Sequence, residues 1–279
     1  MQASREWVPP SGTLGEILES TRQRVASLDK ARPAVVDQAG LSVHPRRPRP
    51  GQPSLREALS GSNVAVIAEI KRRSPSKGAL STDLDAGAQA STFERGGAAA
   101  ISVLTEPHFF GGSLEDIDAV AAATKLPILR KDFHISPAQL GESAKTQASG
   151  ILLIARALPP HELATLLRMA KAAHLDPVVE VRTEGELECA LEFGAGIIGV
   201  NSRNLETLEV DARVPERLVP MIPPGIVAIW ESGVEGLDDV QRAAAAGADA
   251  VLVGSVLSRS RDPEALVRSL TRVPRESRG

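Results

Sequence analysis

The sequence predicts an α/β fold, a (β/α)8 or TIM barrel preceded by an extra N-terminal helix. From Val64 onward, short apolar runs alternate eight times with Ala-rich amphipathic stretches, and apolar runs without a strict two-residue period are typical of parallel strands buried on both faces. The length of 279 residues suits such a barrel, which usually takes roughly 250 residues. A dinucleotide-binding sheet is disfavoured, because the first strand continues into the charged segment Glu69–Pro75 instead of a Gly-rich turn.

Residues 1–60 precede the barrel as an extension that combines a helix with a connector packed on the barrel. Leu14–Ala31 has apolar residues at helical spacing, and we expect Thr13 to cap this helix with Glu16 as its capping-box partner. The Arg- and Pro-rich segment His44–Pro53 could suggest nucleic-acid binding or an SH3 ligand. A stiff connector lying on the barrel suits an acidic chain better.

Residues 61–270 form the predicted barrel and residues 271–279 a frayed tail, so that the chain makes one domain overall. The strands are expected at Val64–Ile70, Ala99–Leu104, Pro127–Lys131, Gly150–Ile154, Pro177–Val181, Ile197–Asn201, Gly225–Ser232 and Ala250–Gly254. Helical patterns between them supply the crossovers that parallel pairing requires. The clearest of these patterns are at Asp116–Ala123, Pro160–Ala173, Glu184–Phe193 and Leu237–Ala245.

Composition narrows the classes of partner. A net charge of −3, with 3% aromatic residues and no Tyr, argues against a nucleic-acid partner, which needs a basic surface and stacking platforms. The longest apolar runs are far too short to cross a bilayer and no signal segment opens the chain, so we expect no membrane partner and a cytoplasmic location. Cys189, the single cysteine, lies in a helical pattern, which argues against disulfides and zinc. We expect a monomer.

Charged and polar residues interrupt the apolar pattern at several strand ends. In barrels of this kind the active site lies at the carboxyl ends of the strands. Taken singly, each residue could form a salt bridge at the rim. Burying all of them without a function would be costly, because an unpaired ion in a low-dielectric site loses several kcal/mol of hydration. We therefore expect one pocket that gathers Glu69, Lys71, Lys131, Glu180, Asn201 and Arg203.

The last two strands end in small residues that indicate a phosphate site. Ser232 and Gly233 follow the seventh strand, and Gly254 and Ser255 follow the eighth, each pair leading into a helix. Backbone N–H groups at such turns bind anions, and the loops after the last two strands are the usual phosphate site of these barrels. Both glycines could be simple tight turns, but their paired occurrence favours a phosphorylated small molecule as the substrate.

Six motifs follow one another along the barrel. They are VIAEIKRRSPSKG (66–78), ISVLTEPHFFGGSLEDI (101–117), LPILRKDFHI (126–135), GVNSRNLETLEVD (199–211), ESGV (231–234) and GADAVLVGSVL (247–257). Together they resemble the indole-3-glycerol phosphate synthase family, and the first and third motifs are the most specific. The similarity spans essentially the whole barrel.

This resemblance implies a decarboxylating ring closure in tryptophan biosynthesis. The substrate would be 1-(2-carboxyphenylamino)-1-deoxyribulose 5-phosphate, which cyclises with loss of CO2 and water to indole-3-glycerol phosphate. No metal and no organic cofactor are expected, because the lysines and carboxylates neutralise one another and rearomatisation drives the decarboxylation.

The resemblance assigns roles to four charged residues. Lys131 would be the general acid at the ribulose C2 carbonyl or hydroxyl, and Glu180 the general base or dehydration partner. Lys71 would contact the substrate carboxylate or phosphate and share in acid catalysis, while Glu69 would hold both lysines and the ring nitrogen in register. A second cation nearby should lower the pKa of the acid lysine toward neutrality, with Glu69 and Glu180 limiting that shift.

The remaining site residues would bind and orient the substrate. Asn201 and Arg203 resemble the pair that orients the anthranilate ring and its carboxylate, with Ser74 near the same end. Two aromatic residues would hold the substrate folded for attack, and four small residues would form the phosphate loop. These are Phe110, Phe133, Ser232, Gly233, Gly254 and Ser255.

One segment departs from the family pattern. After the LRKDF motif the family commonly continues with a Tyr-Gln pair, a Glu-Ala-Arg helix and a Gly-Ala-Asp turn. Here residues 138–150 keep Gln139 and Glu142 but lack the tyrosine, the arginine and the aspartate. Because these positions lie on the helix side of the unit, we expect altered packing or stability rather than lost catalysis.

Two alternatives to the activity implied by the resemblance stay open. The chain could be a catalytically silent or specialised paralogue, or another phosphate-binding barrel enzyme. The presence of Lys131, Glu180 and Lys71 argues against a silent barrel. A phosphoribosylanthranilate isomerase would need a Cys/Asp acid–base pair at strand ends, whereas Cys189 lies in a helical pattern.

Overall fold

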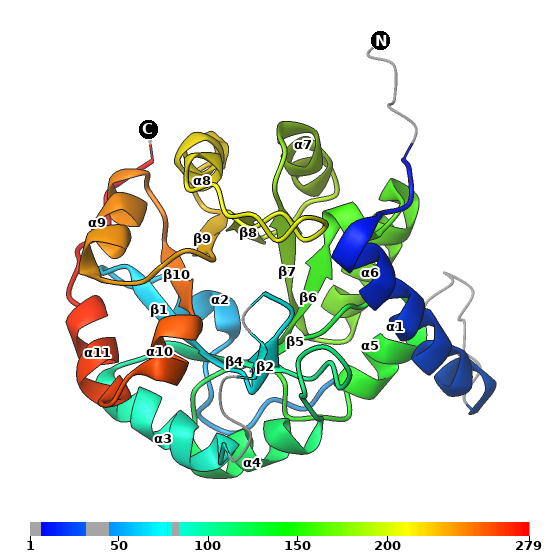
Figure 1. Cartoon of the computed structure of the whole chain (residues 1–279), viewed down its shortest axis with the longest axis horizontal. Helices are drawn as coiled ribbons and strands as arrows, with labels where there is room; N and C mark the ends of the chain where they lie inside the picture. The colour runs from blue at the N-terminus through cyan, green and yellow to red at the C-terminus, as the bar shows by residue number, and fades with distance from the viewer. Residues whose placement is uncertain (1–6, 32–44, 77, 80–83, 279) are drawn as a thin grey trace.

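A closed barrel of parallel strands forms the centre of the molecule (Figure 1). The computed structural model describes residues 7–31, 45–76, 78–79 and 84–278. Around the ring the strands follow the order β1, β10, β9, β8, β7, β6, β5, β4, and β4 pairs with β1. The predicted barrel is confirmed, with each strand end within two residues of its expected place. The strands are β1 Ala65–Ile70, β4 Ala100–Leu104, β5 Ile128–Lys131, β6 Gly150–Ile154, β7 Asp176–Val181, β8 Ile197–Asn201, β9 Val227–Glu231 and β10 Ala250–Val253.

The two-residue period of the strands separates two apolar clusters. Val66 and Ala68 of β1 point outward and pack with the surrounding helices. Ile67, Leu129 and Val178 point inward and fill the barrel with side chains from the other strands. Both faces of each strand are therefore buried, which is why the sequence shows continuous apolar runs instead of alternation.

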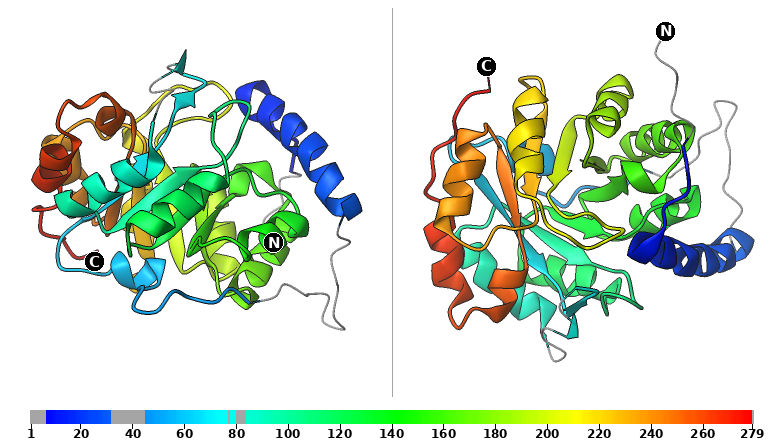
Figure 2. Two further views of the ribbon diagram at one scale, coloured as in Figure 1. Left: turned by 90° about the horizontal axis from the view of Figure 1, so that it is seen from below. Right: turned by 45° about the horizontal axis from the view of Figure 1, so that its top comes forward.

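Helices cover the outside of the barrel (Figures 1 and 2). The helical patterns expected from the sequence are confirmed, and a short hairpin, β2 Arg73–Ser74 with β3 Gly78–Ala79, follows β1. A one-turn helix, α2 Leu55–Ala58, inserts Leu55 into the interior cluster. The other helices are α3 Ala86–Gly96, α4 Glu115–Ala123, α5 Pro137–Ser143, α6 Pro160–Ala172, α7 Glu184–Glu192, α8 Arg213–Leu218, α9 Leu237–Ala245, α10 Ser255–Arg259 and α11 Pro263–Leu270.

The predicted N-terminal helix is α1 Gly12–Ala31, which packs beside α5 outside the ring of strands (Figures 1 and 2). The expectation that Thr13 caps it is wrong, because the helix already begins at Gly12 and Thr13 lies in its first turn. Gly12 has φ +56°, and a Cβ there would lie 2.4 Å from the carbonyl oxygen of Glu206. Close approach to the loop after β8 therefore fixes where α1 starts.

The described part of the Arg- and Pro-rich connector lies at the amino end of the barrel; its first residue, His44, lies outside the described residues. The guanidinium group of Arg49 donates to the carbonyl oxygens of Ala121 and Thr124 at 2.6 and 2.7 Å and to that of Leu126 at 3.0 Å. Arg49 thus holds the connector against the barrel.

The C-terminal tail is anchored, so the expectation that it is frayed is wrong for residues 271–278. The Arg278 side chain is 5% exposed and forms an ion pair of 2.8 Å with Asp249. It also donates to the carbonyl oxygens of Ile222 and Ile226 at 3.1 and 2.6 Å. These hydrogen bonds from Arg278 to main-chain carbonyl oxygens at the amino end of the barrel hold the tail in a fixed position.

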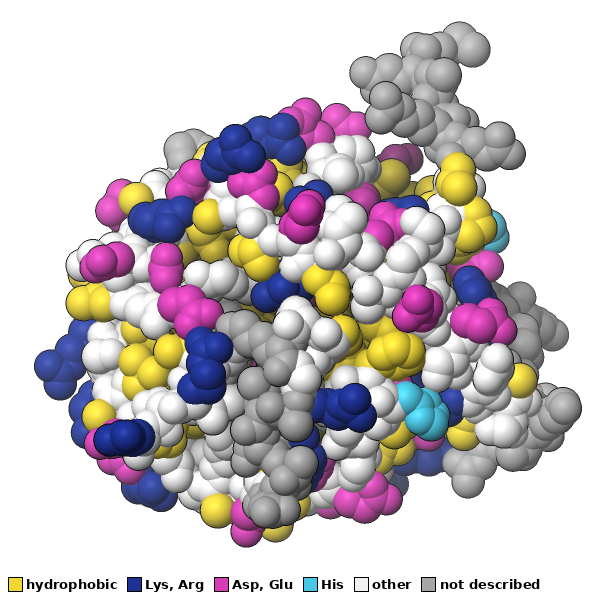
Figure 3. Space-filling model, viewed as in Figure 1, with side chains coloured by type: hydrophobic (Ala, Val, Ile, Leu, Met, Phe, Trp, Pro, Cys, Tyr) yellow, Lys and Arg dark blue, Asp and Glu magenta, His cyan; other side chains and the backbone are white. Residues whose placement is uncertain are grey.

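Acidic and basic side chains are intermixed on the face seen down the barrel (Figure 3). Among the described residues, no helix is both long and apolar enough to span a bilayer.

Candidate active site

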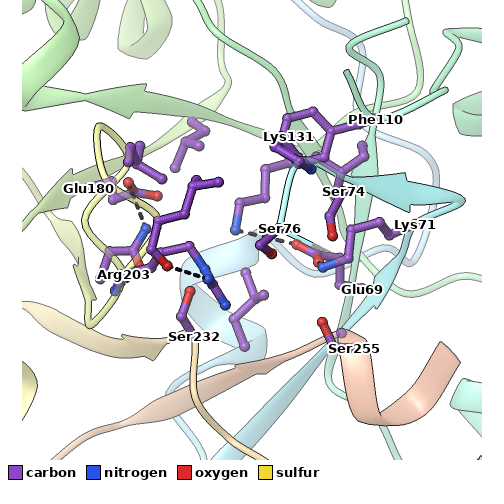
Figure 4. A pocket seen from close by; sticks show the side chains of 18 of the residues that line it. Glu69, Lys71, Ser74, Ser76, Phe110, Lys131, Glu180, Arg203, Ser232 and Ser255 are labelled. Atoms are coloured by element: carbon purple, nitrogen blue, oxygen red, sulfur yellow. Dashed lines mark hydrogen bonds and ion pairs between the residues drawn. The ribbon is translucent and has the colours of Figure 1, made fainter. Parts of the chain in front are cut away.

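One cavity of about 540 Å³ opens at the carboxyl ends of the barrel strands (Figure 4). The structure places all of the predicted site residues on its wall. They are Glu69, Lys71, Ser74, Phe110, Lys131, Phe133, Glu180, Asn201, Arg203, Ser232, Gly233, Gly254 and Ser255. Their contacts, described below, determine what each of them can do chemically.

The two-residue period of the strands aims the charged side chains into this cavity. In β1, Glu69 follows the interior residue Ile67 by two positions. Lys131 of β5 follows the interior residue Leu129 in the same way, as does Glu180 in β7 after its interior valine. Charged residues therefore form the top layer of the barrel interior, above apolar layers.

Lys131 lies at the centre of an ion-pair cluster (Figure 4). Its Nζ is 3.1 Å from Glu231 Oε2 and 3.3 Å from Glu69 Oε2. Burial disfavours the ammonium ion, but the attraction of Glu231, Glu69 and Glu180 outweighs burial and raises the pKa of Lys131. The expectation that a second cation lowers this pKa is wrong, because three carboxyl groups act on the same ammonium ion.

Glu69 bridges the two lysines. Its Oε1 is 2.5 Å from Lys71 Nζ, and its Oε2 faces Lys131. Burial favours the neutral acid, but Lys71 and Lys131 outweigh this effect and lower the pKa of Glu69 to about 2. The Glu69 side chain is therefore a carboxylate at neutral pH and fixes the positions of both ammonium groups.

Glu180 lies across the cavity from Lys71 (Figure 4). It is 4% exposed, and its Oε1 accepts a hydrogen bond of 3.0 Å from Asn201 Nδ2. Burial and repulsion from Glu231 raise the pKa of Glu180 to about 8, against the opposing effect of Lys131. Near neutral pH this carboxyl group can therefore both give and take a proton.

Arg203 lies at the start of the loop after β8. Its N–H donates to Asn201 Oδ1 at 2.9 Å, and its guanidinium donates to the carbonyl oxygen of Leu208 at 2.7 Å. Burial lowers the pKa of Arg203 from its ordinary value. Ser74 lies on the Lys71 side of the cavity, away from Arg203 (Figure 4). The expectation that Ser74 and Arg203 share one end is wrong, because Ser74 belongs to the β2–β3 hairpin, which directly follows β1 and stays on its side of the cavity.

Sequence reasoning missed Glu231, the last residue of β9. It is 1% exposed and supplies the shorter of the two ion pairs to Lys131. Gly199 of β8 makes room for it, because a Cβ there would lie 2.0 Å from Glu231 Oε1. The two-residue period of β9 would have predicted its position. Val227 and Ile229 point inward, so Glu231 also points inward and lies in the same layer as Glu180.

The two glycine turns predicted to bind phosphate have different conformations. Ser232 and Gly233 are both left-handed, with φ +66° and +74°. At Gly254 a Cβ would lie 2.4 Å from Glu69 Oε1 and 3.1 Å from Lys71 Nζ. Gly254 is thus required for clearance of the ion-pair cluster as well as for access to the backbone at the start of α10.

The other end of the cavity is apolar. Phe110 and Phe133 lie with ring centroids 6.0 Å apart, at an interplanar angle of 35°. Leu152 of β6 and Leu205 of the loop after β8 line the same cavity, as does Ile17 of α1. The contribution of α1 was not predicted, because sequence spacing shows which face of a helix is apolar but not what that face covers.

The residues next to Lys131 in sequence are held by side chains of α1 and α5. Arg130 is fully buried; its Nη2 donates to Asp132 at 3.0 Å and to Glu142 at 2.6 Å, and its Nη1 donates to Ser143 Oγ at 2.8 Å. Arg24 of α1 donates to both carboxylate oxygens of Asp132, at 2.7 and 3.2 Å. The end of β5 is therefore tied to α1 and α5.

The segment that departs from the family pattern takes part in this outer network. Ser143 Oγ also lies 3.2 Å from Nε2 of the buried His134, whose Nδ1 lies 2.9 Å from the carbonyl oxygen of Leu152. Burial and the charge of Arg130 lower the pKa of His134 to about 3, so its ring is neutral. None of the altered residues lines the cavity.

Within residues 7–31, 45–76, 78–79 and 84–278, no group of three or more His, Cys, Asp or Glu side chains is arranged to hold a metal ion.

Comparison with known proteins gives consistent matches. The family model described as indole-3-glycerol phosphate synthase matches residues 14–270. Indole-3-glycerol phosphate synthase of Mycolicibacterium gilvum is 46% identical over 92% of this chain and 93% of its own length. The corresponding protein of a Parafrankia species is 50% identical over 78% of this chain and 82% of its own, and indole-3-glycerol phosphate synthase 1 of Streptomyces coelicolor is 46% identical over 92% and 94%.

Among solved structures, thiamine phosphate pyrophosphorylase from Pyrococcus furiosus is similar, with a TM-score of 0.55 and 16% identity over 77% of this chain and 95% of that chain. At this identity the similarity concerns the fold alone.

Proposed function

The chain belongs to the indole-3-glycerol phosphate synthase family, and we propose how its cavity carries out the reaction of that family. The protein is a decarboxylating carbon–carbon lyase of tryptophan biosynthesis. It cyclises 1-(2-carboxyphenylamino)-1-deoxyribulose 5-phosphate to indole-3-glycerol phosphate with loss of CO2 and water. The observation that carries the proposed mechanism is the position of Lys131 between Glu69 and Glu231 at the cavity wall.

In this proposal the substrate phosphate binds at the turns after β9 and β10. Gly233 and Gly254 leave backbone N–H groups accessible there, and Ser255 starts a helix whose N-terminus favours an anion. Lys71 supports the same site, because its Nζ lies 3.1 Å from the place of a Cβ at Gly254. We therefore assign Lys71 to the phosphate rather than to the ring carboxylate, with Ser74 beside it.

The aryl ring lies at the apolar end, against Phe110 and Phe133. Asn201 and Arg203, on the β8 side of the cavity, orient the ring and its carboxylate. This pose folds the substrate so that the ring carbon bearing the carboxylate meets the ribulose C2 carbonyl, and holding the two together removes much of the entropic barrier.

Ring closure is the step assigned to Lys131. Its ammonium group donates a proton to the C2 carbonyl oxygen while the ring carbon that bears the carboxylate bonds to C2. The bond to the carboxylate then breaks, its electron pair restores aromaticity, and CO2 leaves. Because its pKa is raised, Lys131 is charged before substrate binds, and its ammonium group can stabilise the negative charge that develops on the C2 oxygen as the proton is transferred.

Dehydration is the step assigned to Glu180. The neutral carboxyl donates its proton to the C2 hydroxyl, which leaves as water. The resulting carboxylate then takes a proton from the C1 methylene, and the double bond of the indole ring forms. A pKa of about 8 supports both transfers, since proton exchange is most effective near the working pH. The two steps together consume one proton.

The direct test is the formation of indole-3-glycerol phosphate, followed by its fluorescence. Wild-type protein should turn over the carboxyphenylamino substrate without added metal or cofactor. In Lys131→Met we expect kcat to fall by about 10²–10⁴-fold, the usual contribution of a general acid, with the circular dichroism spectrum unchanged. Turnover close to wild type in this variant would exclude Lys131 as the acid.

We also propose that the chain acts as a monomeric single domain. Every residue used in the proposed mechanism comes from one chain and lines one cavity, so no second copy is required. Light scattering at assay concentration should give the mass of one chain, 29.4 kDa.

A further inference from the structure

The loop after β8 folds back on itself beside the catalytic cavity. Its two arms meet at an isolated antiparallel bridge between Arg203 and Val210, and Asn204 N donates to the carbonyl oxygen of Glu209 at 2.8 Å. Between the arms the chain turns, and Asn204 Oδ1 accepts the N–H of Glu206 at 2.8 Å. The loop therefore has a defined backbone that its own hydrogen bonds hold.

Leu208 closes this turn in an uncommon conformation. Its φ is +65°, in the left-handed region, and its N–H donates to the carbonyl oxygen of Asn204 at 2.7 Å. A bulky side chain is disfavoured there by steric contact with the backbone, so Gly or Asn is the usual residue at such a position. Strained residues persist where the surrounding structure holds them, and they gather at binding and active sites. The conformation of Leu208 therefore calls for a functional explanation.

The carbonyl group of Leu208 holds the side chain of Arg203. It accepts a hydrogen bond of 2.7 Å from Arg203 Nη1, and Arg203 lines the catalytic cavity (Figure 4). Among the described residues, no other side-chain nitrogen of Arg203 has a hydrogen-bond partner. Its Nε and Nη2 groups, which share one edge of the guanidinium, thus remain for a ligand. Two N–H groups at one edge form the fork that binds a carboxylate through two hydrogen bonds.

The backbone of Leu208 and the direction of this fork are coupled. If Leu208 left the left-handed region, its peptide group would rotate, and Arg203 would lose the acceptor that fixes the orientation of its planar group. Glycine or asparagine would hold the same backbone at less cost, but neither would supply the apolar side chain with which Leu208 lines the cavity. Leucine thus combines an apolar wall with a carbonyl group that contacts Arg203.

We propose that Leu208 is a positioning residue for the ring carboxylate of the substrate, because its left-handed backbone directs the Nε–Nη2 edge of Arg203 toward that carboxylate. The inference rests on the proposed function for the place of the carboxylate. Leu208 acts through Arg203 and touches no reacting atom. Its effect should therefore appear in recognition of the carboxylate, and in KM more than in kcat.

The test uses two ligands that bind without reacting. Both are the substrate with its C2 ketone reduced to an alcohol, one with the ring carboxylate and one with hydrogen in its place. The ratio of their dissociation constants, measured by isothermal titration calorimetry, gives the carboxylate preference of the protein. It is measured in wild type, Leu208→Gly, Leu208→Asn and Leu208→Val. Gly and Asn tolerate the left-handed region, whereas the β-branched Val strongly disfavours it.

Leu205 supplies the matched control position. It lies on the same loop and lines the same cavity, but it is not among the residues with positive φ. At Leu205, Gly and Val should give carboxylate preferences within about threefold of each other, because neither replaces a left-handed residue. A difference between Gly and Val that is confined to Leu208 therefore reports on the backbone rather than on the lost side chain.

Wild type should prefer the carboxylate about tenfold or more, the factor that one hydrogen bond to a charged group supplies. Leu208→Gly and Leu208→Asn should keep this preference within about threefold, whereas Leu208→Val should lower it about fivefold or more, since Val favours extended backbone. In Arg203→Met, adding Leu208→Val should change the preference by less than about twofold, because no guanidinium group is left to direct. In turnover assays of Leu208→Val, the loss should appear mainly in KM.

Equal carboxylate preferences in Leu208→Gly and Leu208→Val would overturn the inference, and so would an equal effect of Leu208→Val with and without Arg203. If wild type turns over the substrate and prefers the carboxylate while Leu208→Val changes nothing, the role of Leu208 fails and the proposed function stands. Equal binding of both ligands by wild type would refute the proposed place of the carboxylate, and the inference with it. Thermal melting of each variant establishes that the compared proteins are folded.

Discussion

Strand β9 has a buried carboxylate at each of its ends. Glu231 is its last residue and is 1% exposed; Asp249, 2% exposed, accepts the N–H of Ala228 near its start at 2.7 Å. Both carboxylates face cations, but the surroundings differ. Asp249 pairs with Arg275 and Arg278, whereas Glu231 pairs with Lys131 and its Oε1 has no hydrogen-bond partner in the described part of the chain.

The difference separates what the two ends of the barrel do. At the amino end, the guanidinium groups of Arg49 and Arg278 donate hydrogen bonds to main-chain carbonyl oxygens. These side chains therefore hold segments of the chain in place. At the carboxyl end, Lys131 and Lys71 contact carboxylates beside an open cavity. Buried polar groups normally have hydrogen-bond partners within the protein. The two lysines at the cavity can, in addition, bind a substrate that enters it.

The amino end should show large effects on stability alone. In Arg278→Met, Asp249 loses one of its two arginines and several carbonyl oxygens lose a donor. Breaking a buried ion pair typically costs about 3–5 kcal/mol, and we expect the free energy of unfolding in urea to fall by about 3 kcal/mol. Turnover at a temperature where the variant is folded should match wild type. Arg272→Met, at an exposed arginine of the same tail, is the matched control and should change stability by less than about 0.5 kcal/mol.

A second contrast concerns Glu206, a structural residue at the catalytic end. Its carboxylate accepts from Ser11 N at 2.7 Å and from Arg156 Nη2 at 3.1 Å. The neighbouring Leu205 and, on α1, Ile17 both line the catalytic cavity. The Glu206 side chain thus adds a second link between the start of α1 and the loop after β8, beside the main-chain hydrogen bond of 3.2 Å from Thr13 N to its carbonyl oxygen.

In Glu206→Ala we expect KM to rise about tenfold, with a smaller change in kcat, because the wall of the aryl end loses its anchor while Lys131 is untouched. A loss of roughly 1.4 kcal/mol in binding corresponds to this factor. Glu216→Ala is the control, since Glu216 pairs with Arg242 at 2.8 Å on the outer surface. If both variants change melting temperature equally and neither changes KM, Glu206 has no positioning role.

The stability of the protein should also depend on pH through the carboxyl end of the barrel, with a smaller effect than those of the variants above. Between the ordinary value of 4.5 and a pKa of about 8, folded Glu180 keeps a proton that the unfolded chain releases. The free energy of unfolding should therefore fall as pH rises through this window, by at most about 1.4 kcal/mol per pH unit from this group. Glu69, with its pKa lowered to about 2, acts in the opposite sense and only at lower pH, as its carboxylate becomes protonated.

In Glu180→Gln this slope should be shallower than in wild type between about pH 5 and pH 8. Urea unfolding at several pH values measures it, and Glu216→Gln, at an exposed carboxyl group on the outer surface, serves as the control. Identical slopes in wild type and Glu180→Gln would mean that Glu180 is ionised throughout, and that its proposed role as acid fails.

The barrel could be predicted because burial on both faces leaves continuous apolar runs, and the strand ends could be placed because charge interrupts those runs. The same period of two would have found Glu231, which follows Val227 and Ile229 inward. The positions of the candidate site residues around one cavity followed from the closed topology.

Other features depend on contacts between distant segments, which spacing does not encode. The raised pKa of Lys131 results from Glu231 and Glu180, which are brought to it by other strands. The anchored tail depends on Arg278 reaching carbonyl groups that are 31 to 56 residues away in sequence. The start of α1 is set by the approach of Gly12 to Glu206, and Gly254 is constrained by Glu69 as well as by its turn.

The central claim is that two similarly buried carboxylates serve different ends of the barrel, and the paired variants Glu231→Gln and Asp249→Asn test it most directly. Measuring kcat and the free energy of unfolding for both, we predict that Glu231→Gln lowers kcat by about 10²-fold or more. It should lower stability by less than Asp249→Asn does, because Lys131 keeps its ion pair with Glu69 and the repulsion between Glu231 and Glu180 is relieved. Asp249→Asn should lower stability by about 3 kcal/mol and leave kcat of the folded protein within about twofold of wild type. The opposite pattern, or an equal loss of both quantities in the two variants, would contradict the account.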